Sequence, residues 1–263
     1  MSRPVALVTG GGRGIGAAIS DRLAADGYDV LLTYNQSSKP AEMVVDEIRE
    51  RGDDALAVKV DCADMGEVGL LGQHPWMDRG IDVLVLNHGV YNRVQGHAMT
   101  LDDLTATMRT NFEGAVAVWK AVQPHLTAKA RMVVVGSQLG TRGSPHGADY
   151  AASKAALSTW ARSLAQSVGP EGKRVNILAP GYVDTDILAG DSEEKRQQRE
   201  QEVPLQRVGS PEDMAATVSF LVGPDSAYIT GAILHVNGGL YPPSLGGFSG
   251  RLHGGGLGRR RLV

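Results

Sequence analysis

The sequence predicts an α/β fold in which buried parallel strands alternate with helices. Short apolar runs recur along the chain, as expected for strands that are covered on both faces of a parallel sheet. Segments of helical pattern separate these runs. The first run ends in a glycine-rich turn that leads directly into a helical pattern. Strand, turn and helix in that order form the context that a dinucleotide-binding turn requires.

Seven apolar runs are expected to form the strands. Small or polar residues follow each run, and in a parallel sheet these residues gather at one edge, where open α/β sheets bind ligands. The predicted strands span residues 5–9, 29–34, 55–60, 81–86, 131–136, 174–179 and 232–236.

Helical patterns occupy most of the intervals between the strands. Ser210 as N-cap and Pro211 at the first helical position begin the last of them. After Cys62, glycines and a proline interrupt the pattern, so this segment should be short and irregular. The predicted helices span about residues 17–25, 42–51, 101–124, 150–168 and 211–222.

Regular alternation up to about residue 240 favours a single catalytic domain, residues 1–240. Residues 186–206 are highly charged and follow the carboxyl end of a strand, which predicts a solvated helix placed to act as a lid. From residue 241 the composition becomes rich in glycine and arginine without periodicity. We expect residues 241–263 to form a flexible tail, with binding to an acidic partner as the weaker alternative.

Composition excludes several classes of protein. The net charge of −3 and the pI of about 6.2 give no global basic field for nucleic acid or membranes. Cys62 is the one cysteine, which excludes an internal disulfide and fits a reducing, cytoplasmic compartment. It has no Cys or His cluster beside it, so we expect no metal site. No signal peptide or apolar membrane span is evident.

The glycine turn is the first candidate binding element. Gly10, Gly14 and Gly16 are spaced Gly-x-x-x-Gly-x-Gly, with Arg13 and Ile15 between them. Glycines permit a tight turn and a close approach to a pyrophosphate, whose charge is favoured at the N-terminus of the next helix. A merely flexible glycine loop is the competing interpretation, and the strand–turn–helix context argues against it.

The end of the second strand favours NADP(H) over NAD(H). A carboxylate there would bind the adenosine ribose of NAD(H) and repel a 2′-phosphate. The sequence instead offers Asn35, Ser37 and Lys39, with Arg13 in the glycine turn. Lysine and arginine suit a phosphate. NAD(H) remains possible, since Lys39 and Arg13 are alternatively interpreted as solvated surface charges.

Tyr150 and Lys154 are spaced to share one face of a helix, with Ser137 at the end of the strand before them. A neighbouring ammonium is expected to lower the pKa of the phenol towards the range of a proton shuttle. Alone, this pair is equally typical of an ordinary helix surface, and the glycine turn favours a site. Asn111 lies in a predicted helix that it does not suit, which indicates a local distortion, a functional carbonyl or simple surface polarity.

Two further strand ends carry candidate residues. Asp61 is placed either to accept from the adenine amino group or to cap the following helix. Asn87 and Gly89 follow the fourth strand, where a glycine lets a ligand lie close. His88, between them, has no evident orienting partner in the sequence, and packing or a backbone hydrogen bond is favoured over catalysis for it.

With these residues in place, the chain resembles the short-chain dehydrogenase/reductase family over about residues 3–240. The likeness is specific because four separated signals occur in order: Thr9-Gly10-x-x-x-Gly14-x-Gly16, Asn87-x-Gly89, Ser137 with Tyr150-x-x-x-Lys154, and Pro180-Gly181. The resemblance implies a Rossmann-type, doubly wound, seven-stranded parallel sheet with helices on both faces. It also implies a nicotinamide cofactor.

The resemblance further implies a catalytic set of Ser137, Tyr150, Lys154 and Asn111. Tyr150 would exchange the proton, Ser137 would hold the substrate oxygen, and Lys154 would bind the nicotinamide ribose and lower the tyrosine pKa. Asn111 would hold a water that relays protons. The expected cofactor-binding residues are Gly10, Arg13, Gly14, Ile15, Gly16, Asn35, Ser37, Asp61, Cys62, Asn87, Gly89, Tyr150, Lys154, Pro180, Gly181, Val183 and Thr185. The expected substrate contacts are Tyr91, Gln138, His146 and Tyr182.

Within the family, the pattern is most similar to 3-oxoacyl-[acyl-carrier-protein] reductases, notably at Asp61-Cys62 and over residues 203–212 and 236–239. Leu86 and His88 depart from the usual residues. No clear basic patch for a carrier protein is evident, so a ketoreductase of specialised metabolism is a second interpretation of the substrate. Because a fold does not dictate a function, an NAD-dependent alcohol or sugar dehydrogenase and a cofactor-binding regulatory protein also stay open.

The family resemblance also implies a homo-oligomer, most commonly a tetramer. Its members often pair the helices that here carry Asn111 and Tyr150. Ala161 and Ala165 are small residues on the second of these helices, and we expect them at the contact between subunits.

Overall fold

The computed structural model describes residues 3–185, 188 and 190–240. All seven strands are parallel, in the order β3-β2-β1-β4-β5-β6-β7, and this confirms the predicted sheet. The predicted tail, residues 241–263, lies outside the described residues. The strands are β1 Val5–Thr9, β2 Asp29–Tyr34, β3 Ala55–Lys59, β4 Ile81–Leu86, β5 Leu126–Val135, β6 Arg174–Pro180 and β7 Ile233–Val236.

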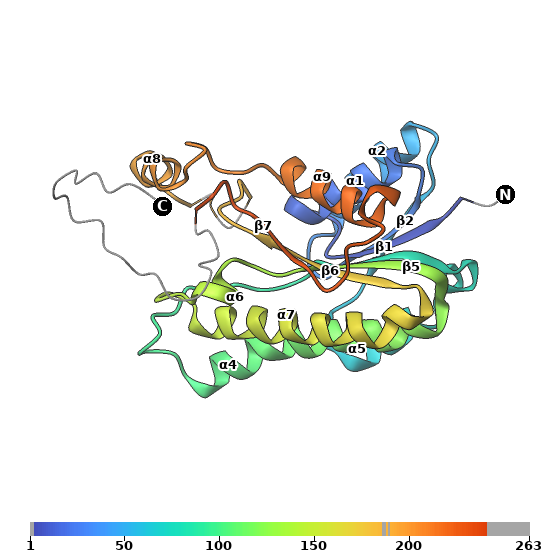
Figure 1. The fold of residues 1–263 in the computed structure, drawn as a ribbon, viewed down its shortest axis with the longest axis horizontal. Helices are drawn as coiled ribbons and strands as arrows, with labels where there is room; N and C mark the ends of the chain where they lie inside the picture. The colour runs from blue at the N-terminus through green and yellow to red at the C-terminus, as the bar shows by residue number, and fades with distance from the viewer. Residues whose placement is uncertain (1–2, 186–187, 189, 241–263) are drawn as a thin grey trace, which may run out of the picture.

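Helices cover both faces of the sheet (Figure 1). One apolar cluster joins the sheet to α1 (Gly14–Ala25), α2 (Ser38–Glu50) and α9 (Pro211–Val222). A second cluster joins the opposite face to α3, α5 and α7. Because β1, β2, β4 and β6 are buried almost throughout, nearly continuous apolar runs were a reliable signal for these strands. The helices of the second face are α3 Met65–Leu71, α4 Leu101–Met108, α5 Gly114–Val122 and α7 Ala148–Val168.

The strand order places the ligand-binding crevice. From β1 the chain moves outward to β3 and then returns to β4, which pairs with the other side of β1. This reversal is the topological switch point of a doubly wound sheet, and ligands bind above the carboxyl ends of the strands that flank it. Thr9 and Leu86, the last residues of β1 and β4, are paired there.

Several element boundaries differ from the prediction. The helices α1 and α2 begin at Gly14 and Ser38, about one turn before the predicted starts at residues 17 and 42. β5 begins at Leu126, five residues before the predicted start at residue 131. Helix N-termini and strand extensions depend on local backbone hydrogen bonds that an apolar pattern does not record. Four-residue α6, Leu139–Arg142, occupies part of the predicted loop before α7.

The long helical stretch around Asn111 is broken. Between α4 and α5 the chain forms one π-helical turn, Arg109–Glu113. Gly114 follows it, and a Cβ there would lie 2.3 Å from the Cys62 carbonyl oxygen. A wide turn next to a close backbone contact is typical of a functional site. The structure therefore confirms the local distortion that Asn111 predicted.

The rest of the described chain consists of short elements and one charged helix. Asp64, and not Asp61, is the N-cap of α3, and the 3-10 turn η1 (Pro75–Arg79) follows, so the segment is short and irregular as predicted. Ser210 caps α9 through a capping box, as predicted. Helix α8 is Glu193–Glu202, and the remaining 3-10 turns are η3 Gln123–His125, η4 Gly169–Glu171 and η5 Pro224–Ser226.

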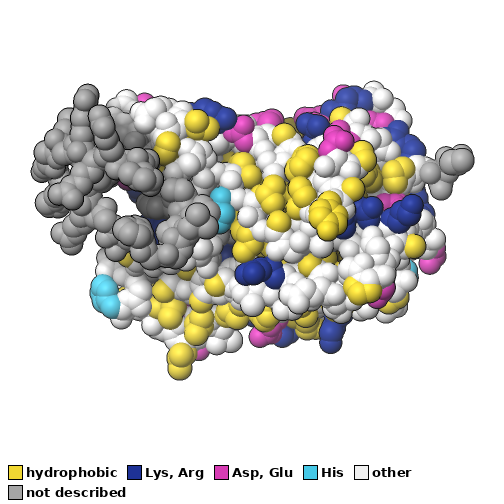
Figure 2. All heavy atoms as spheres, viewed as in Figure 1, with side chains coloured by type: hydrophobic (Ala, Val, Ile, Leu, Met, Phe, Trp, Pro, Cys, Tyr) yellow, Lys and Arg dark blue, Asp and Glu magenta, His cyan; other side chains and the backbone are white. Residues whose placement is uncertain are grey.

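Charges are mixed over the visible surface. Basic and acidic side chains are interspersed on the face in Figure 2, outside the part that grey atoms cover. In the described part of the chain, no helix has the length and apolar character that a bilayer crossing needs.

Candidate active site

The glycine turn lies at the end of β1 and forms a cradle that a side chain would fill. Gly14 has φ +51°, a conformation that favours glycine. A Cβ on Gly16 would lie 2.0 Å from the Gly10 carbonyl oxygen. Helix α1 starts here without an acidic residue in its first turn. The N–H groups of a helix start and its positive dipole end suit a pyrophosphate, so the turn fits a dinucleotide.

A second helix start stands beside the first. Ser37 is the N-cap of α2, and its side chain makes no capping hydrogen bond within the described residues. Asn35 and Lys39 are exposed next to it, and Arg13 is the exposed N-cap residue of α1. The first turn of α2 has no acidic residue. Two helix starts and two cations at neighbouring strand ends fit the extra phosphate of NADP(H).

The end of β4 is tied to the glycine turn. The Asn87 amide donates to the carbonyl oxygens of Thr9 and Gly10, at 3.1 and 3.0 Å. Asn87 therefore shapes the turn. At Gly89 the backbone is exposed, and a Cβ there would lie 3.3 Å from Lys154 Nζ.

Asp61 and Cys62 follow β3 and differ in exposure. Asp61 Oδ1 accepts from the backbone N–H of Ala63 at 2.9 Å, so the carboxylate closes the turn before α3. Cys62 is buried, and burial is the main cause that raises the pKa of its thiol to about 12. The thiol is therefore a core side chain at neutral pH.

Ser137, Tyr150 and Lys154 come together as the sequence predicts. Ser137 follows β5, and Tyr150 and Lys154 lie one turn apart on α7. The Ser137 hydroxyl interacts with the Tyr150 phenol and acts to lower its pKa. Lys154 Nζ lies 5.7 Å from the centroid of the Tyr150 ring and donates to the Val135 carbonyl at 2.9 Å. Strand β5 and helix α7 thus bring a hydroxyl, a phenol and an amine to one place.

The predicted lowering of the Tyr150 pKa is wrong for this structure. Burial is the largest effect and raises the pKa of Tyr150 to about 12, with a smaller rise from Tyr91. The hydrogen bond with Ser137 acts in the opposite direction. Burial also lowers the pKa of Lys154 to about 8. In a buried site, desolvation of the phenolate outweighs the attraction of an ammonium that is held against Val135.

Hydrogen bonds with Val90 and Ser153 hold the side chain of Asn111. Its Oδ1 accepts from the Val90 N–H at 2.7 Å, and its Nδ2 donates to the Val90 carbonyl at 2.9 Å and to Ser153 Oγ at 3.0 Å. Ser153 in turn donates to the Tyr150 carbonyl. Ser153 therefore links the π-helical turn to α7. Sequence reasoning missed this residue, although a serine three residues after Tyr150 is a known spacing for a back-bond to the helix.

The end of β6 closes the crevice on the side of β7. Pro180 ends β6, and a Cβ on Gly181 would lie 2.6 Å from Asn237 Cβ. Val183 is buried and forms a bridge with Gly209. Thr185 lies against the glycine turn, with its Cγ2 3.3 Å from where a Cβ of Gly14 would be. Thr185, one of the expected cofactor-binding residues, therefore lies at the pyrophosphate cradle.

The four predicted substrate residues are not equivalent. Tyr91 packs edge-on against Tyr150, with ring centroids 4.8 Å apart, and donates to the His146 carbonyl at 2.8 Å. Gln138 is 3% exposed, and its Oε1 accepts from the Asn237 amide. Tyr182 donates to Glu202 of α8 at 3.0 Å. Tyr91 thus lies against Tyr150 and His146 holds Tyr91 through its carbonyl, whereas Gln138 and Tyr182 hold neighbouring segments together.

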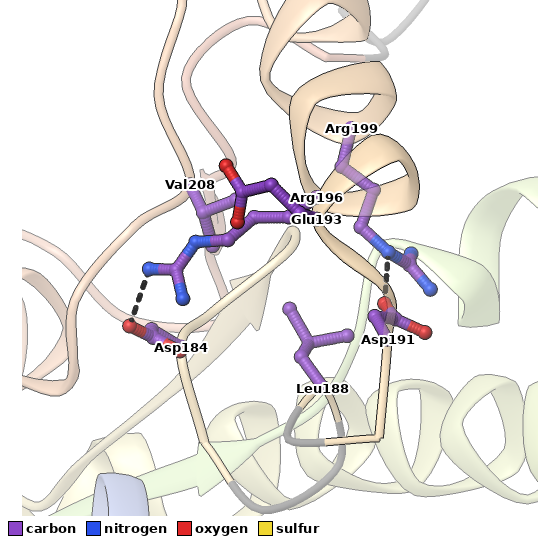
Figure 3. Close-up of a pocket in the computed structure, with 7 residues that line it drawn as sticks. All are labelled: Asp184, Leu188, Asp191, Glu193, Arg196, Arg199 and Val208. Atoms are coloured by element: carbon purple, nitrogen blue, oxygen red, sulfur yellow. Dashed lines mark hydrogen bonds and ion pairs between the residues drawn. The ribbon is translucent and has the colours of Figure 1, made fainter.

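A charged cavity of about 110 Å³ lies under α8 (Figure 3). Arg196 reaches Asp184 at 2.8 Å, and Arg199 reaches Asp191 at 2.6 Å. Arg93, from the segment after β4, is 3.7 Å from Asp191. The pairs with Asp184 and Arg93 join the predicted lid to the segments after β6 and β4, whereas the Arg199–Asp191 pair lies within the lid. Residues 186, 187 and 189 of that segment lie outside the described residues.

Comparison with known proteins identifies the family. The family model described as enoyl-(acyl carrier protein) reductase matches residues 10–241. The 3-oxoacyl-[acyl-carrier-protein] reductase of Staphylococcus aureus is 36% identical over 239 residues, covering 90% of this chain and 97% of the relative. A short chain dehydrogenase from Burkholderia cenocepacia, solved in complex with NADP, superposes with a TM-score of 0.85. It is 40% identical and covers 90% of this chain and 97% of its own.

The chain belongs to the short-chain dehydrogenase/reductase family. It is an oxidoreductase acting on CH–OH or C=O groups, as the sequence predicts. The homologue from Synechocystis, a 3-oxoacyl-[acyl-carrier-protein] reductase, is 37% identical over 245 residues, 91% of this chain and 98% of the relative. A blue fluorescent protein from a metagenomic library, solved with NADPH, has a TM-score of 0.85 and 37% identity and covers 91% of this chain and 98% of its own. Two neighbours with NADP or NADPH agree with the predicted cofactor.

Proposed function

We propose that this short-chain dehydrogenase/reductase reduces a ketone to a secondary alcohol with NADPH. The observation that carries the proposal is that the Ser137 hydroxyl interacts with the Tyr150 phenol, with Lys154 buried one turn after Tyr150 on the same helix. This group lies at the carboxyl edge of the sheet, beside the glycine turn. A proton donor and a hydroxyl for the substrate oxygen therefore stand next to the dinucleotide cradle.

NADPH, when bound, would supply the hydride to the carbonyl carbon and leave as NADP+. Tyr150 would give its proton to the carbonyl oxygen. Its raised pKa keeps the phenol protonated at neutral pH, which suits reduction rather than oxidation. Ser137 would hold the same oxygen through its hydroxyl and stabilise the charge that develops there. Lys154, mostly protonated below about pH 8, would then favour the phenolate left behind.

The cofactor would lie across the edges of β1, β2 and β4. Gly10, Gly14 and Gly16 would border the pyrophosphate at the start of α1. Arg13 and the start of α2 would hold the 2′-phosphate. We assign the remaining predicted contacts as a set: Ile15, Asn35, Ser37, Asp61, Asn87, Gly89, Pro180, Gly181, Val183 and Thr185.

The relatives favour a 3-oxoacyl substrate over an unrelated ketone. The relatives named above act on acyl-carrier-protein substrates by their names, at 36–37% identity over most of the chain. Arg93, Arg196 and Arg199 lie around the cavity under α8, but each is within ion-pair distance of a carboxylate. These arginines are therefore balanced by acids and do not by themselves favour a carrier-bound substrate. A ketone that is not carrier-bound is the alternative substrate.

The experiment that tests the function follows NADPH absorbance with a panel of 3-oxoacyl thioesters and free ketones. We expect Tyr150→Phe to reduce kcat by about 10²–10⁴-fold, the usual contribution of general acid–base catalysis. Thr159→Ala, on the exposed face of the same helix, is the matched control and should behave like the parent. A Tyr150→Phe protein as active as the parent would remove the proposed role of the phenol.

A further inference from the structure

His88 has a defined environment that none of the roles above uses. It follows β4 and packs between the end of β1 and the π-helical turn. Its Nδ1 is 2.7 Å from Thr9 Oγ1, and its Cα is 3.1 Å from where a Cβ of Gly10 would lie. On its other side, the Thr110 carbonyl interacts with the ring. Nε2 is buried and has no hydrogen bond of normal geometry within the described residues, so this contact is long or bent.

The contacts of Thr9 determine which ring nitrogen carries the hydrogen. A threonine hydroxyl has one hydrogen and two lone pairs. Thr9 Oγ1 already accepts from the backbone N–H groups of Asn87 and His88, at 3.0 and 3.3 Å. A hydrogen on His88 Nδ1 would be a third donor on that oxygen. The Thr9 hydroxyl therefore donates to His88 Nδ1 at 2.7 Å, which is a closer acceptor than the Val85 carbonyl at 3.3 Å. The neutral ring then carries its hydrogen on Nε2.

We propose that His88 is a positioning residue whose Nε2–H, directed at the Thr110 carbonyl, holds the π-helical turn in place for the reaction proposed above. Thr110 directly precedes Asn111, so the position of one sets the position of the other. Lys154 Nζ and Asn111 Oδ1 lie 3.3 and 3.2 Å from the same point, the place of a Cβ on Gly89. A shift of the turn would therefore move Asn111 relative to Lys154.

The ring stays neutral over the range in which the enzyme would work. Burial is the main cause that lowers the pKa of His88 to about 4, and the charge of Lys154 lowers it further. The Thr110 carbonyl and the carboxylate of Asp61 act in the opposite direction. Tyr150 is neutral there as well. A donor on Nε2 is therefore present at every pH near neutrality.

Two substitutions of His88 test the contacts of Nδ1 and Nε2 separately. His88→Asn keeps an acceptor near the position of Nδ1 for Thr9 and loses the group that faces Thr110. His88→Gln extends to the position of Nε2 and retains a donor there. We expect His88→Asn to lower kcat by about 10–100-fold, since a displacement of about 1 Å in a site can have that effect. The KM for NADPH should change little, because the glycine turn keeps its own contacts.

We expect His88→Gln to retain most of the parent's kcat. Equal losses in both variants, or full activity of His88→Asn, would overturn the proposal. Thermal unfolding of both variants shows whether a loss of kcat reflects a loss of fold. A loss of thermal stability in His88→Asn alone would also overturn the proposal, because His88 would then serve stability.

A second measurement needs neither cofactor nor turnover. In protein carrying ¹⁵N-labelled histidine, the ring spectrum should show His88 with hydrogen on Nε2 and none on Nδ1, unchanged from about pH 8 to pH 5. The signal is assigned by its absence from His88→Gln. Hydrogen on Nδ1 would overturn the assignment. If the parent oxidises no NADPH with any ketone, the proposed function fails while the spectrum still tests the placement of the ring.

Discussion

At the Tyr150 phenol, burial and the nearby amine act in opposite directions. Burial raises the pKa of Tyr150, and the same burial lowers the pKa of Lys154. Both groups are thereby biased towards their neutral forms. A neutral phenol is the form that can donate a proton to a carbonyl oxygen. In the proposed reduction, the charge of Lys154 would act after Tyr150 has given up its proton.

The pH dependence of the reaction follows from Lys154. Its pKa is lowered to about 8, so the ammonium predominates below pH 8 and is lost above it. We expect kcat/KM for NADPH, which reports groups of the free enzyme, to fall about tenfold per pH unit above about pH 8. Lys154→Arg, which stays charged, should lack this fall if it retains activity. A wild-type profile that is level to pH 10 contradicts the assignment.

The choice between NADPH and NADH also depends on individual residues. Arg13 and Lys39 stand at the starts of α1 and α2, where the 2′-phosphate is expected. A hydrogen bond to a charged group contributes about 1.5–3 kcal/mol. We therefore expect Arg13→Ala with Lys39→Ala to weaken NADPH binding by at least about tenfold and to leave NADH binding nearly unchanged. Fluorescence titration with both cofactors measures this. A parent that prefers NADH would refute the predicted preference.

At the scale of elements, the apolar pattern predicted the strands better than the helices. Strands buried on both faces are apolar throughout, so their positions in sequence are almost fully specified, whereas the partly exposed first half of β5 was missed. Helix starts depend on local turns, and α1 and α2 begin earlier than their apolar patterns suggest. Asn111 signalled a distortion, but the π-helical turn needs tertiary contacts such as that of Gly114 with Cys62. The Tyr150 pKa was predicted wrongly because burial is a property of the folded chain.

The glycine turn can be tested as an element. A Cβ on Gly16 would lie 2.0 Å from the Gly10 carbonyl, so Gly16→Ala must displace backbone. We expect it to lower the free energy of unfolding by about 1–3 kcal/mol, as overpacking does, and to abolish NADPH binding. Gly69→Ala is the matched control. In α3, nothing among the described residues lies within 4 Å of its Cβ, so a gain of about 0.5–1 kcal/mol is expected. Urea unfolding of both variants compares them.

At the scale of the molecule, the structure contradicts the prediction that two alanines of α7 lie at a subunit contact. Ala161 and Ala165, expected at a subunit contact, are 0% and 3% exposed. They pack in the core of their own chain. Helix α7 carries small residues on more than one side, so its sequence does not show which side faces the sheet. Its exposed side instead presents Thr159, Arg162, Ser163 and Gln166.

Exposed apolar side chains provide a different reason to expect a tetramer. Leu101 on α4 is 78% exposed, whereas Phe220 on α9 and Tyr228 beyond η5 are 41% and fully exposed. Helices α4 and α9 lie on opposite faces of the sheet (Figure 1). Exposed apolar side chains on both faces suit a tetramer with two kinds of twofold interface, because each such interface uses the same residues of both subunits.

Breaking one of these interfaces should therefore leave a dimer. We expect the parent to sediment as a tetramer at micromolar concentration and Phe220→Glu with Tyr228→Ser to sediment as a dimer, since a buried unpaired carboxylate opposes association. Met43→Glu, at a 61% exposed position on α2, is the control and should remain tetrameric. A monomeric parent would exclude the assembly altogether. A double variant that stays tetrameric would place the second interface elsewhere on the surface.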